Sequence, residues 1–313
     1  MKLDPKTTAF VFPGQGSQAV GMGKALAEEY AEAKKLFDEA DAILGFSLSN
    51  LMWNGPDTDL NDTVNTQPAL FLHSIASFQT FSRLFPDFEP VALAGHSLGE
   101  LSALTAAGAL SFESGLRLVR KRGELMKRAG ELAPGSMAAI LGVDIPTLDT
   151  VCAEASVAEE IVQVANDNCP GQVVISGAKA AVERAMAGAK AAGAKRALPL
   201  AVSIAAHSPL MASIQGEWNE AVNSAEIHHP KIPVVGNVHA LAIKTADEAR
   251  ADIKAQMQSR VRWTESVKTM SEMGIRSFVE SGTGSVLGGL IKRICSDASI
   301  QPLGAPADFN ALQ

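Results

Sequence analysis

Short apolar runs alternate along this chain with longer segments whose apolar residues recur every three or four positions. Residues 8–12 and 91–94 are apolar runs typical of buried strands, and each is followed by glycines. Helical patterns follow, and the predicted helices cover residues 23–41, 67–81 (with Pro68 in the first turn), 101–107 and 111–129. This alternation predicts an α/β protein with a mostly parallel sheet.

The segment between residues 135 and 202 has a rhythm of its own. It predicts two helices between four strands, with strands at 137–143, 161–166, 172–176 and 196–202 and helices at 146–155 and 179–192. The order β-α-β-β-α-β is the ferredoxin-like arrangement. We therefore expect a small subdomain, residues 134–203, inserted into a larger discontinuous one formed by residues 1–133 and 204–313.

Composition narrows the class of protein. Of 313 residues, 47% are hydrophobic and 19% charged, which indicates a globular chain. No apolar run reaches the roughly 18 residues of a membrane span, and the first residues lack a secretory signal. The three cysteines are scattered, which argues against zinc and disulfides and favours a reducing cytoplasm. The net charge of −7 gives no reason to expect nucleic-acid binding. Because the sequence has no clear extra apolar surface stripe, we expect a monomer.

The sequence Gly-His-Ser-Leu-Gly at residues 95–99 lies between a predicted strand and a predicted helix. This is the context of a nucleophile elbow, a turn so sharp that its flanking positions must be small. Ser97 then projects from the carboxyl end of the strand, and the N–H of Leu98 is free to meet a developing oxyanion. His96 supports the turn or contacts the substrate. The alternative is a simple tight turn.

Two further residues are candidates for chemistry. His207 follows a strand-like run at the junction of the two predicted subdomains, where it would face a cleft as a base for Ser97; the alternative is a capping or solvent histidine. Arg122 lies in the apolar stripe of its predicted helix, so its guanidinium is expected to be buried. Such a group needs acceptors, either in an internal salt bridge or as a bidentate clamp for a substrate carboxylate.

The loop at residues 14–18 follows the first strand and contains two glycines. With Ala19 it fits a dinucleotide pattern, but the next twenty residues are helical and lack the second strand and acidic residue that such a site requires. A loop that offers backbone donors beside an active site fits better, and Gln15 is the candidate for the second oxyanion N–H.

Together these residues resemble the malonyl-CoA:acyl carrier protein transacylase family over nearly the whole chain. The resemblance implies an α/β-hydrolase-like large subdomain with a ferredoxin-like small one. The motifs that carry it are residues 12–18 (FPGQGSQ), 67–69 (QPA), 95–100 (GHSLGE), Arg122-Gly123, residues 168–177 (NCPGQVVISG), His207 with Met211, and Trp263.

The resemblance also implies roles. Ser97 is the acyl nucleophile and His207 its general base and later acid. The N–H groups of Gln15 and Leu98 form the oxyanion hole, and Arg122 binds the malonyl carboxylate. Gln256 matches the residue whose main-chain carbonyl orients the histidine, a role that asks nothing of its side chain. The malonyl group would pass from malonyl-CoA to Ser97 and then to the phosphopantetheine thiol of holo acyl carrier protein, in ping-pong fashion and without a metal or bound cofactor. The pathway is either fatty-acid or polyketide synthesis, and a free-standing chain of this length favours fatty-acid synthesis.

Two positions depart from the family. Ile204-Ala205-Ala206 before the histidine matches neither the Ala-Phe-His pattern of malonyl-selective relatives nor the Ala-Ser-His pattern of methylmalonyl-selective ones, which leaves acyl selectivity open. Ser285 stands where many relatives carry lysine, a change that bears on carrier or coenzyme contacts. Lys292, Arg293 and the cationic face of the 111–129 helix are candidate docking charges for an acidic carrier, or ordinary solvated charges.

Two other functions share parts of this pattern. A thioesterase would use water in place of the carrier thiol. Its triad acid would lie between Ser97 and His207 in chain order. Candidates in that interval are Asp144, Asp149 and Asp167, all within the predicted insertion. A carrier-binding scaffold would need no chemistry and would be marked by a lost dyad residue.

Overall fold

A six-stranded sheet with the order β10-β9-β1-β2-β7-β8 forms the centre of the computed structural model, which describes residues 3–312. Neighbouring strands are parallel except for the antiparallel edge pair β7–β8, which confirms the predicted α/β class. The strands are β1 (Thr8–Phe12), β2 (Ala92–Gly95), β7 (Val234–Val235), β8 (Ala242–Ile243), β9 (Ser277–Ser281) and β10 (Ser299–Leu303).

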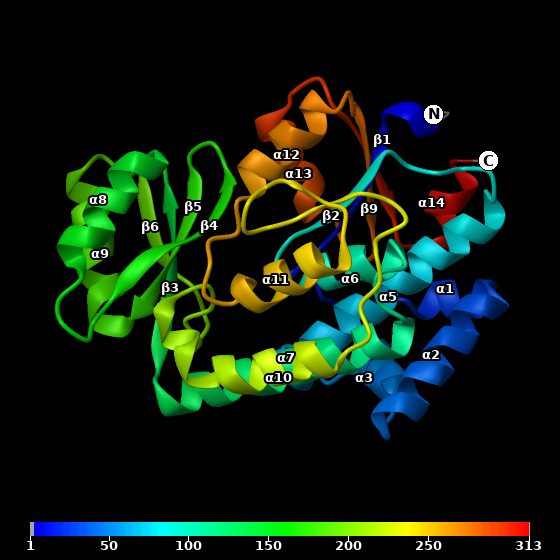
Figure 1. Ribbon diagram of the computed structural model, residues 1–313, viewed down its shortest axis with the longest axis horizontal. Helices are drawn as coiled ribbons and strands as arrows, with labels where there is room; N and C mark the ends of the chain where they lie inside the picture. The colour runs from blue at the N-terminus through cyan, green and yellow to red at the C-terminus, as the bar shows by residue number, and fades with distance from the viewer. Residues whose placement is uncertain (1–2, 313) are drawn as a thin grey trace.

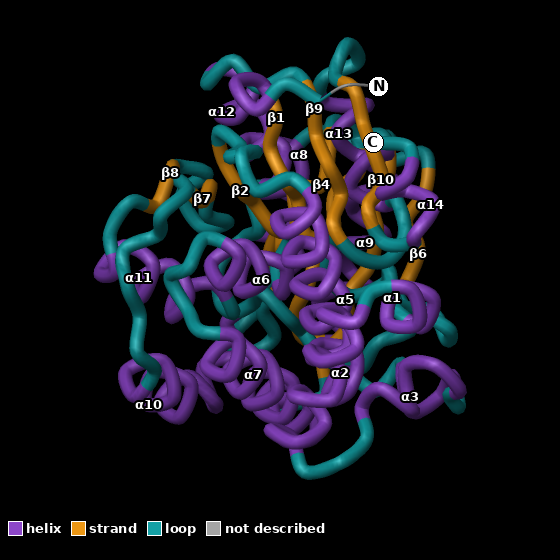
Figure 2. Tube along the Cα trace, turned by 90° about the vertical axis from the view of Figure 1, so that its right-hand side faces the viewer, coloured by secondary structure: helices purple, strands orange, loops and turns teal. Residues whose placement is uncertain are grey.

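Helices cover both faces of this sheet. Successive side chains of a strand point to opposite faces, so the apolar residues of each strand have to be buried on both sides. Phe10 and Phe12 of β1 pack into the larger core, whereas Ala9 and Val11 belong to a second core, which also contains Trp263, on the other face. Figure 2 shows β2, β1, β9 and β10 side by side behind α5 and α6. The larger core is completed by α1 (Lys24–Glu29), α2 (Ala31–Leu44), α3 (Leu48–Asn54), α5 (Thr63–Leu84), α6 (Leu98–Ala106), α7 (Phe112–Leu132), α10 (Gln215–Ser224) and α11 (Ala246–Gln256), and the opposite face by α12 (Trp263–Glu272) and α13 (Val286–Ile294).

A second, antiparallel sheet with the order β4-β5-β3-β6 lies beside the first, with α8 and α9 on its outer side (Figure 1). Its elements follow one another as β-α-β-β-α-β, the order that the sequence predicts. They are β3 (Gly135–Leu141), α8 (Ile145–Ala155), β4 (Val162–Cys169), β5 (Gln172–Ala178), α9 (Lys179–Ala191) and β6 (Arg196–Pro199). The remaining short elements are η1 (Pro5–Thr7), α4 (Asp57–Leu60), η2 (Pro209–Ile214) and α14 (Pro306–Asn310).

The single helix expected over residues 23–41 is wrong, because the structure divides it at Tyr30. Tyr30 has an extended backbone (φ −117°, ψ 113°) that ends α1 and begins α2. Its ring packs against Phe309 of α14, with ring centroids 5.4 Å apart. A tertiary contact with a residue far along the chain therefore accompanies a break that local periodicity does not predict.

The helix expected to begin at residue 67 starts earlier, at Thr63, and is capped by the side chain of Asp62. Pro68 therefore lies inside the helix rather than in its first turn. Because proline has no N–H, it cannot donate to the carbonyl of Val64, four residues earlier. Arg120 of α7 donates to that carbonyl instead, at 3.2 Å. A side chain from another helix thus satisfies the carbonyl that the proline leaves without its helical donor.

Candidate active site

The segment that carries Ser97 is a strained turn between β2 and α6. Ser97 has φ 52° and ψ −108°, a conformation that costs free energy for a residue other than glycine. A Cβ at Gly95 would lie 1.9 Å from the carbonyl carbon of Gly99, and one at Gly99 would lie 2.0 Å from the Phe12 oxygen. The prediction that small residues flank this turn is confirmed.

His207 lies against the Ser97 hydroxyl. Its Nε2 is 2.8 Å from Ser97 Oγ, and its Nδ1 is 2.9 Å and 3.1 Å from the carbonyl oxygens of Gln256 and Ser259. Because carbonyl oxygens only accept, we assign the proton to Nδ1, which leaves Nε2 as the acceptor for the serine proton. His207 is buried and also has a positive φ, 58°. The geometry suits a base held in one tautomer by main-chain atoms.

In residues 3–312, no carboxylate forms a hydrogen bond with the His207 ring. The three aspartates that a triad could use have other partners: Asp144 caps α8, Asp149 pairs with Arg260, and Asp167 accepts from Thr264. The arrangement is a serine–histidine dyad, without the third group of a hydrolase triad.

Burial and, after it, the nearby charge of Arg122 together lower the pKa of His207 to about 3. The neutral form, the one able to accept a proton, therefore persists as the pH falls and is lost only near that value. From pH 7 to pH 5 we expect kcat/KM to change by less than about twofold, whereas a histidine of pKa about 6.5 would lose about 25-fold. A pH profile of the reaction that the resemblance implies measures this, and an inflection near pH 6.5 would contradict it.

Arg122 lies beside the same hydroxyl, with only 2% of its surface exposed. Its Nη1 donates to Gln67 Oε1 at 2.9 Å, and its Nη2 donates to Gln256 Oε1 at 2.8 Å and to Ser97 Oγ at 3.0 Å. Each of these acceptors is a neutral oxygen, so none of these bonds is the internal salt bridge considered from the sequence. Burial lowers the pKa of the guanidinium to about 10, which leaves it charged at neutral pH.

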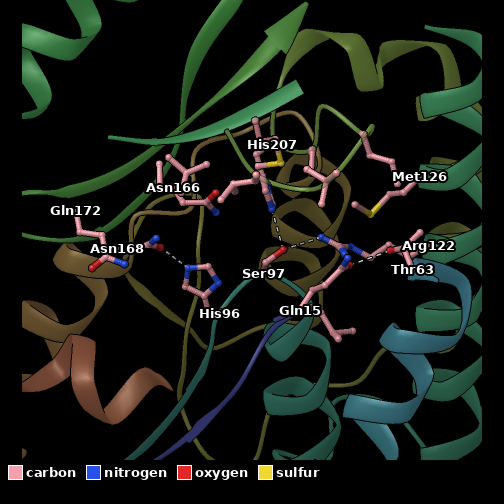
Figure 3. A pocket seen from close by; sticks show the side chains of 18 residues that line it. Gln15, Thr63, His96, Ser97, Arg122, Met126, Asn166, Asn168, Gln172 and His207 are labelled. Carbon is pink, nitrogen blue, oxygen red and sulfur yellow. Dashed lines mark hydrogen bonds between the residues drawn. The ribbon is translucent and has the colours of Figure 1, made fainter. Parts of the chain in front are cut away.

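A cavity of about 330 Å³ lies above these three residues, between the carboxyl edge of the parallel sheet and the second sheet (Figure 3). Its lining comes from the second sheet and from helices and loops beside the first: Gln15, Thr63, His96, Ser97, Leu98, Arg122, Met126, Met137, Ala139, Asn166, Asn168, Gln172, Val174, Leu200, Val202, Ile204, Ala206 and His207. A cleft bounded by the carboxyl ends of parallel strands is where α/β proteins bind ligands. No group of three or more His, Cys, Asp or Glu side chains in the described part of the chain is arranged to hold a metal ion.

Gln15 and Leu98 lie at the carboxyl ends of the neighbouring strands β1 and β2, and both line the cavity. Leu98 is the first residue of α6, so its N–H has no partner within the helix. The Gln15 side chain is held by Thr63, whose hydroxyl donates to it at 2.9 Å. These positions suit two backbone donors to a carbonyl oxygen bound at Ser97.

His96 points away from Ser97 toward the second sheet (Figure 3). Its Nε2 is 2.8 Å from Oδ1 of Asn168 on β4, and its ring packs edge-on against Trp263 at 5.7 Å. Burial lowers the pKa of its imidazole, so the ring is neutral at neutral pH. His96 joins the elbow to the second sheet at the edge of the cavity.

Asn237, which follows β7, was missed by the sequence reasoning. Its Oδ1 accepts from the N–H of Ser97 at 2.7 Å, and its Nδ2 donates to the carbonyl of Gly95 at 2.7 Å. One buried amide therefore holds the elbow on both sides. Its position is set by the pairing of β7 with β2, which the sequence pattern does not indicate.

The side chain of Gln256 also has a function that the sequence reasoning missed. Besides its carbonyl bond to His207, Gln256 accepts from Arg122 through Oε1 and donates through Nε2 to the Ser97 carbonyl at 3.0 Å. The contact with His207 uses only the main chain, as expected, and these side-chain bonds to Arg122 and Ser97 are additional to it. Gln67, named only as part of a motif, is the other amide that holds Arg122.

Comparison with known proteins gives a consistent result. A family model described as "Acyl transferase domain" matches residues 9–300. The "Malonyl CoA-acyl carrier protein transacylase" of Haemophilus influenzae is 44% identical over 308 residues (98% of both chains), and that of Bacillus subtilis is 46% identical over 288 residues (91% of this chain, 90% of the relative).

Two solved structures are similar over nearly their full length. An acyl carrier protein S-malonyltransferase from Vibrio cholerae superposes with a TM-score of 0.94 at 44% identity, covering 98% of this chain and 100% of that one. A malonyl-transacylase in complex with a type II PKS acyl carrier protein superposes with a TM-score of 0.93 at 41% identity, covering 98% of both chains.

Proposed function

The chain belongs to the acyl transferase domain family, and we propose that Ser97, His207 and Arg122 are the residues with which it transfers a malonyl group from malonyl-CoA to acyl carrier protein. The observation that carries the assignment is the meeting of these three side chains in one cavity. Ser97 Oγ lies 2.8 Å from His207 Nε2 and 3.0 Å from Arg122 Nη2. A nucleophile, its base and a carboxylate-binding cation are thus in contact.

The first half-reaction makes an ester on Ser97. His207 Nε2 takes the hydroxyl proton as Oγ attacks the thioester carbonyl of malonyl-CoA. The carbonyl oxygen becomes negative and is met by the N–H groups of Gln15 and Leu98, each donor contributing about 3–4 kcal/mol. The carbon–sulfur bond then breaks, His207 returns its proton to the coenzyme A thiolate, and malonyl-serine remains.

The second half-reaction repeats the first with another thiol. His207 takes the proton of the phosphopantetheine thiol of holo acyl carrier protein, and the sulfur attacks the malonyl-serine carbonyl. The proton returns to Ser97 Oγ as the ester breaks. Because one dyad serves both directions, the enzyme alternates between two half-reactions and the kinetics are ping-pong.

Arg122 selects donors that carry a free carboxylate. Before substrate binds, its guanidinium is held by the side-chain oxygens of Gln67, Gln256 and Ser97, which are neutral. A malonyl carboxylate supplies the counter-charge that these amides do not, whereas an acetyl donor leaves the buried charge unpaired. Ile204 and Ala206, the residues that depart from the family pattern, line the same cavity and bound the space for the acyl chain.

The carrier protein is expected to approach from the side of Arg293. Arg293 donates to Gln172 Oε1 and to the Pro170 carbonyl, and Gln172 lines the cavity. The cationic face of α7 is a poorer candidate, because each of its cations is already paired: Arg117 with Glu113, Arg120 with Glu124, Lys121 and Arg128 with Glu217, and Lys127 with Asp62. Exposed Lys292 and Ser285 lie on or next to the same helix as Arg293.

Several further properties belong to this proposal. The reaction as derived calls for no bound cofactor. The large subdomain comprises residues 1–133 and 204–313 and the inserted one residues 134–203. A monomer in the cytoplasm stays a prediction. Among the described helices, none is long and apolar enough to cross a bilayer.

Brief exposure to malonyl-CoA followed by intact-protein mass spectrometry tests the transfer. We expect a malonyl adduct on the enzyme that disappears on addition of holo acyl carrier protein and persists in buffer. An adduct that water clears as quickly would favour the thioesterase, a function that the dyad's lack of a carboxylate argues against. If no adduct formed with malonyl-CoA or acetyl-CoA, the nucleophile assignment would fail and a carrier-binding scaffold would remain.

A further inference from the structure

Two carboxyl groups that the transfer mechanism does not use lie buried behind the Ser97 elbow. Glu100 is in the first turn of α6 and has no exposed surface, and Asp252 of α11 is 6% exposed. They come from segments about 150 residues apart in the sequence and meet beneath the loop that follows β7. A buried charge is costly unless it is paired, so this pair calls for an explanation.

The pair contacts the loop that holds the nucleophile. Glu100 Oε2 accepts from the N–H of Asn237 at 2.6 Å. Asp252 lies against the preceding residue, so that a Cβ on Gly236 would come within 3.0 Å of its Oδ1. Asn237 in turn accepts from the Ser97 N–H and donates to the Gly95 carbonyl. The loop residues Gly236 and Asn237 therefore connect the two carboxyl groups to the turn that carries Ser97.

Each carboxyl has one oxygen without a donor. Within residues 3–312, Glu100 Oε1 and Asp252 Oδ2 are buried and accept a hydrogen bond from no donor. The two side chains lie against adjacent residues of one loop, Asn237 and Gly236, and are close enough for each to shift the pKa of the other. A proton on one carboxyl converts an unpartnered acceptor into a donor and satisfies both atoms at once.

Burial and the mutual repulsion of the two carboxylates favour this protonation. Burial, and then the charge of Asp252, raises the pKa of Glu100 well above its ordinary value, and burial also raises that of Asp252. The charged or titratable groups that face them are Arg122 of α7, toward Glu100, and His239, toward Asp252. Neither forms an ion pair with them in the described part of the chain.

We propose that Glu100 and Asp252 share one proton between Oε1 and Oδ2 and that this pair positions the nucleophile elbow through Asn237. The inference rests on the proposed function of Ser97. The shared proton limits the pair to a single negative charge. A second charge would repel the first and would compete with the substrate carboxylate for Arg122.

Amide substitutions test the pair because they keep its charge and its hydrogen-bond donor. In Glu100→Gln, Nε2 replaces the carboxyl O–H and Asp252 stays ionised; Asp252→Asn supplies the donor from the other side. We expect both variants to keep kcat for malonyl transfer within about threefold of the wild type. In Glu100→Ala, Asn237 loses its partner, and kcat falls by about 10- to 100-fold with KM nearly unchanged.

Infrared difference spectroscopy measures the proton directly. A protonated carboxyl absorbs at higher frequency than a carboxylate, so the wild-type spectrum at neutral pH is expected to contain a band that Glu100→Gln removes. Glu124→Gln is the matched control: it removes an exposed carboxyl that pairs with Arg120, and the band should remain. Thermal unfolding of each variant separates loss of positioning from loss of fold.

Two outcomes would overturn the proposal. One is a pair of folded amide variants that are both as slow as Glu100→Ala, which would show that the carboxylates themselves are required. The other is the absence of a carboxyl band that depends on Glu100. Neither outcome changes whether the wild-type enzyme forms a malonyl adduct. The proposal of a shared proton can therefore fail while the transferase assignment holds, and the two failures are distinguishable.

Discussion

Ser97→Ala is expected to form no malonyl adduct and to slow malonyl transfer by at least about 10⁴-fold, because no other hydroxyl lies against His207 Nε2 in the described part of the chain. The residual rate would come from donors and binding groups that remain, namely the N–H groups of Gln15 and Leu98 and the cation of Arg122. The fold is expected to survive, since alanine keeps the Cβ at the elbow and the bond from the residue 97 N–H to Asn237 uses the backbone.

Intact-protein mass spectrometry and a coupled transfer assay measure this result. Ser102→Ala is the matched control: Ser102 is a buried serine within α6, close to Ser97 in the sequence, and it does not line the cavity. Normal adduct formation in that variant would show that the loss belongs to position 97. A malonyl adduct on Ser97→Ala itself would place the nucleophile elsewhere and overturn the mechanism.

Arg122→Ala is expected to lower kcat/KM for malonyl-CoA by about 10²- to 10³-fold, the cost of truncating one partner of a buried, hydrogen-bonded charge pair. The same change removes the unpaired charge that an acetyl donor meets in the wild type. The ratio of malonyl to acetyl transfer should therefore fall by more than the malonyl rate alone. Gln67 and Gln256 lose their donor, so part of the loss will reflect a looser cavity.

Competition between malonyl-CoA and acetyl-CoA gives this ratio directly. Arg117→Ala removes a guanidinium from the exposed face of the same helix, where it pairs with Glu113, and should leave the ratio unchanged. Equal losses for both donors in Arg122→Ala would argue against a carboxylate clamp. They would leave Arg122 as a group that only holds Ser97 and the two glutamines in place.

Local sequence is a good guide wherever a single turn or a single face decides the structure. The elbow could be identified because Gly95 and Gly99 must be small within one turn, a steric demand that the sequence carries locally. Arg122 could be placed in the interior because its helical neighbours are apolar. The alternation of strand and helix patterns also indicated the class of both sheets, because each pattern depends on residues close together in the sequence.

The break at Tyr30 and the role of Pro68 depended on more distant partners. Tyr30 packs on Phe309, and the carbonyl that Pro68 leaves free is met by Arg120. The periodicity of apolar residues predicts each helix separately. It carries no information about contacts with residues that are distant in the sequence.

The sequence by itself determined the reacting groups of this protein: a serine in an elbow, a candidate histidine and an arginine in an apolar stripe. Only the tertiary structure decided how they are held. Asn237 reaches Ser97 across 140 residues, and the Gln256 side chain reaches it across 159. Glu100 and Asp252 likewise meet only once the sheet has brought α6 and α11 together. The physical reason is that a hydrogen bond depends on the distance between atoms, whereas a motif depends on the distance along the chain.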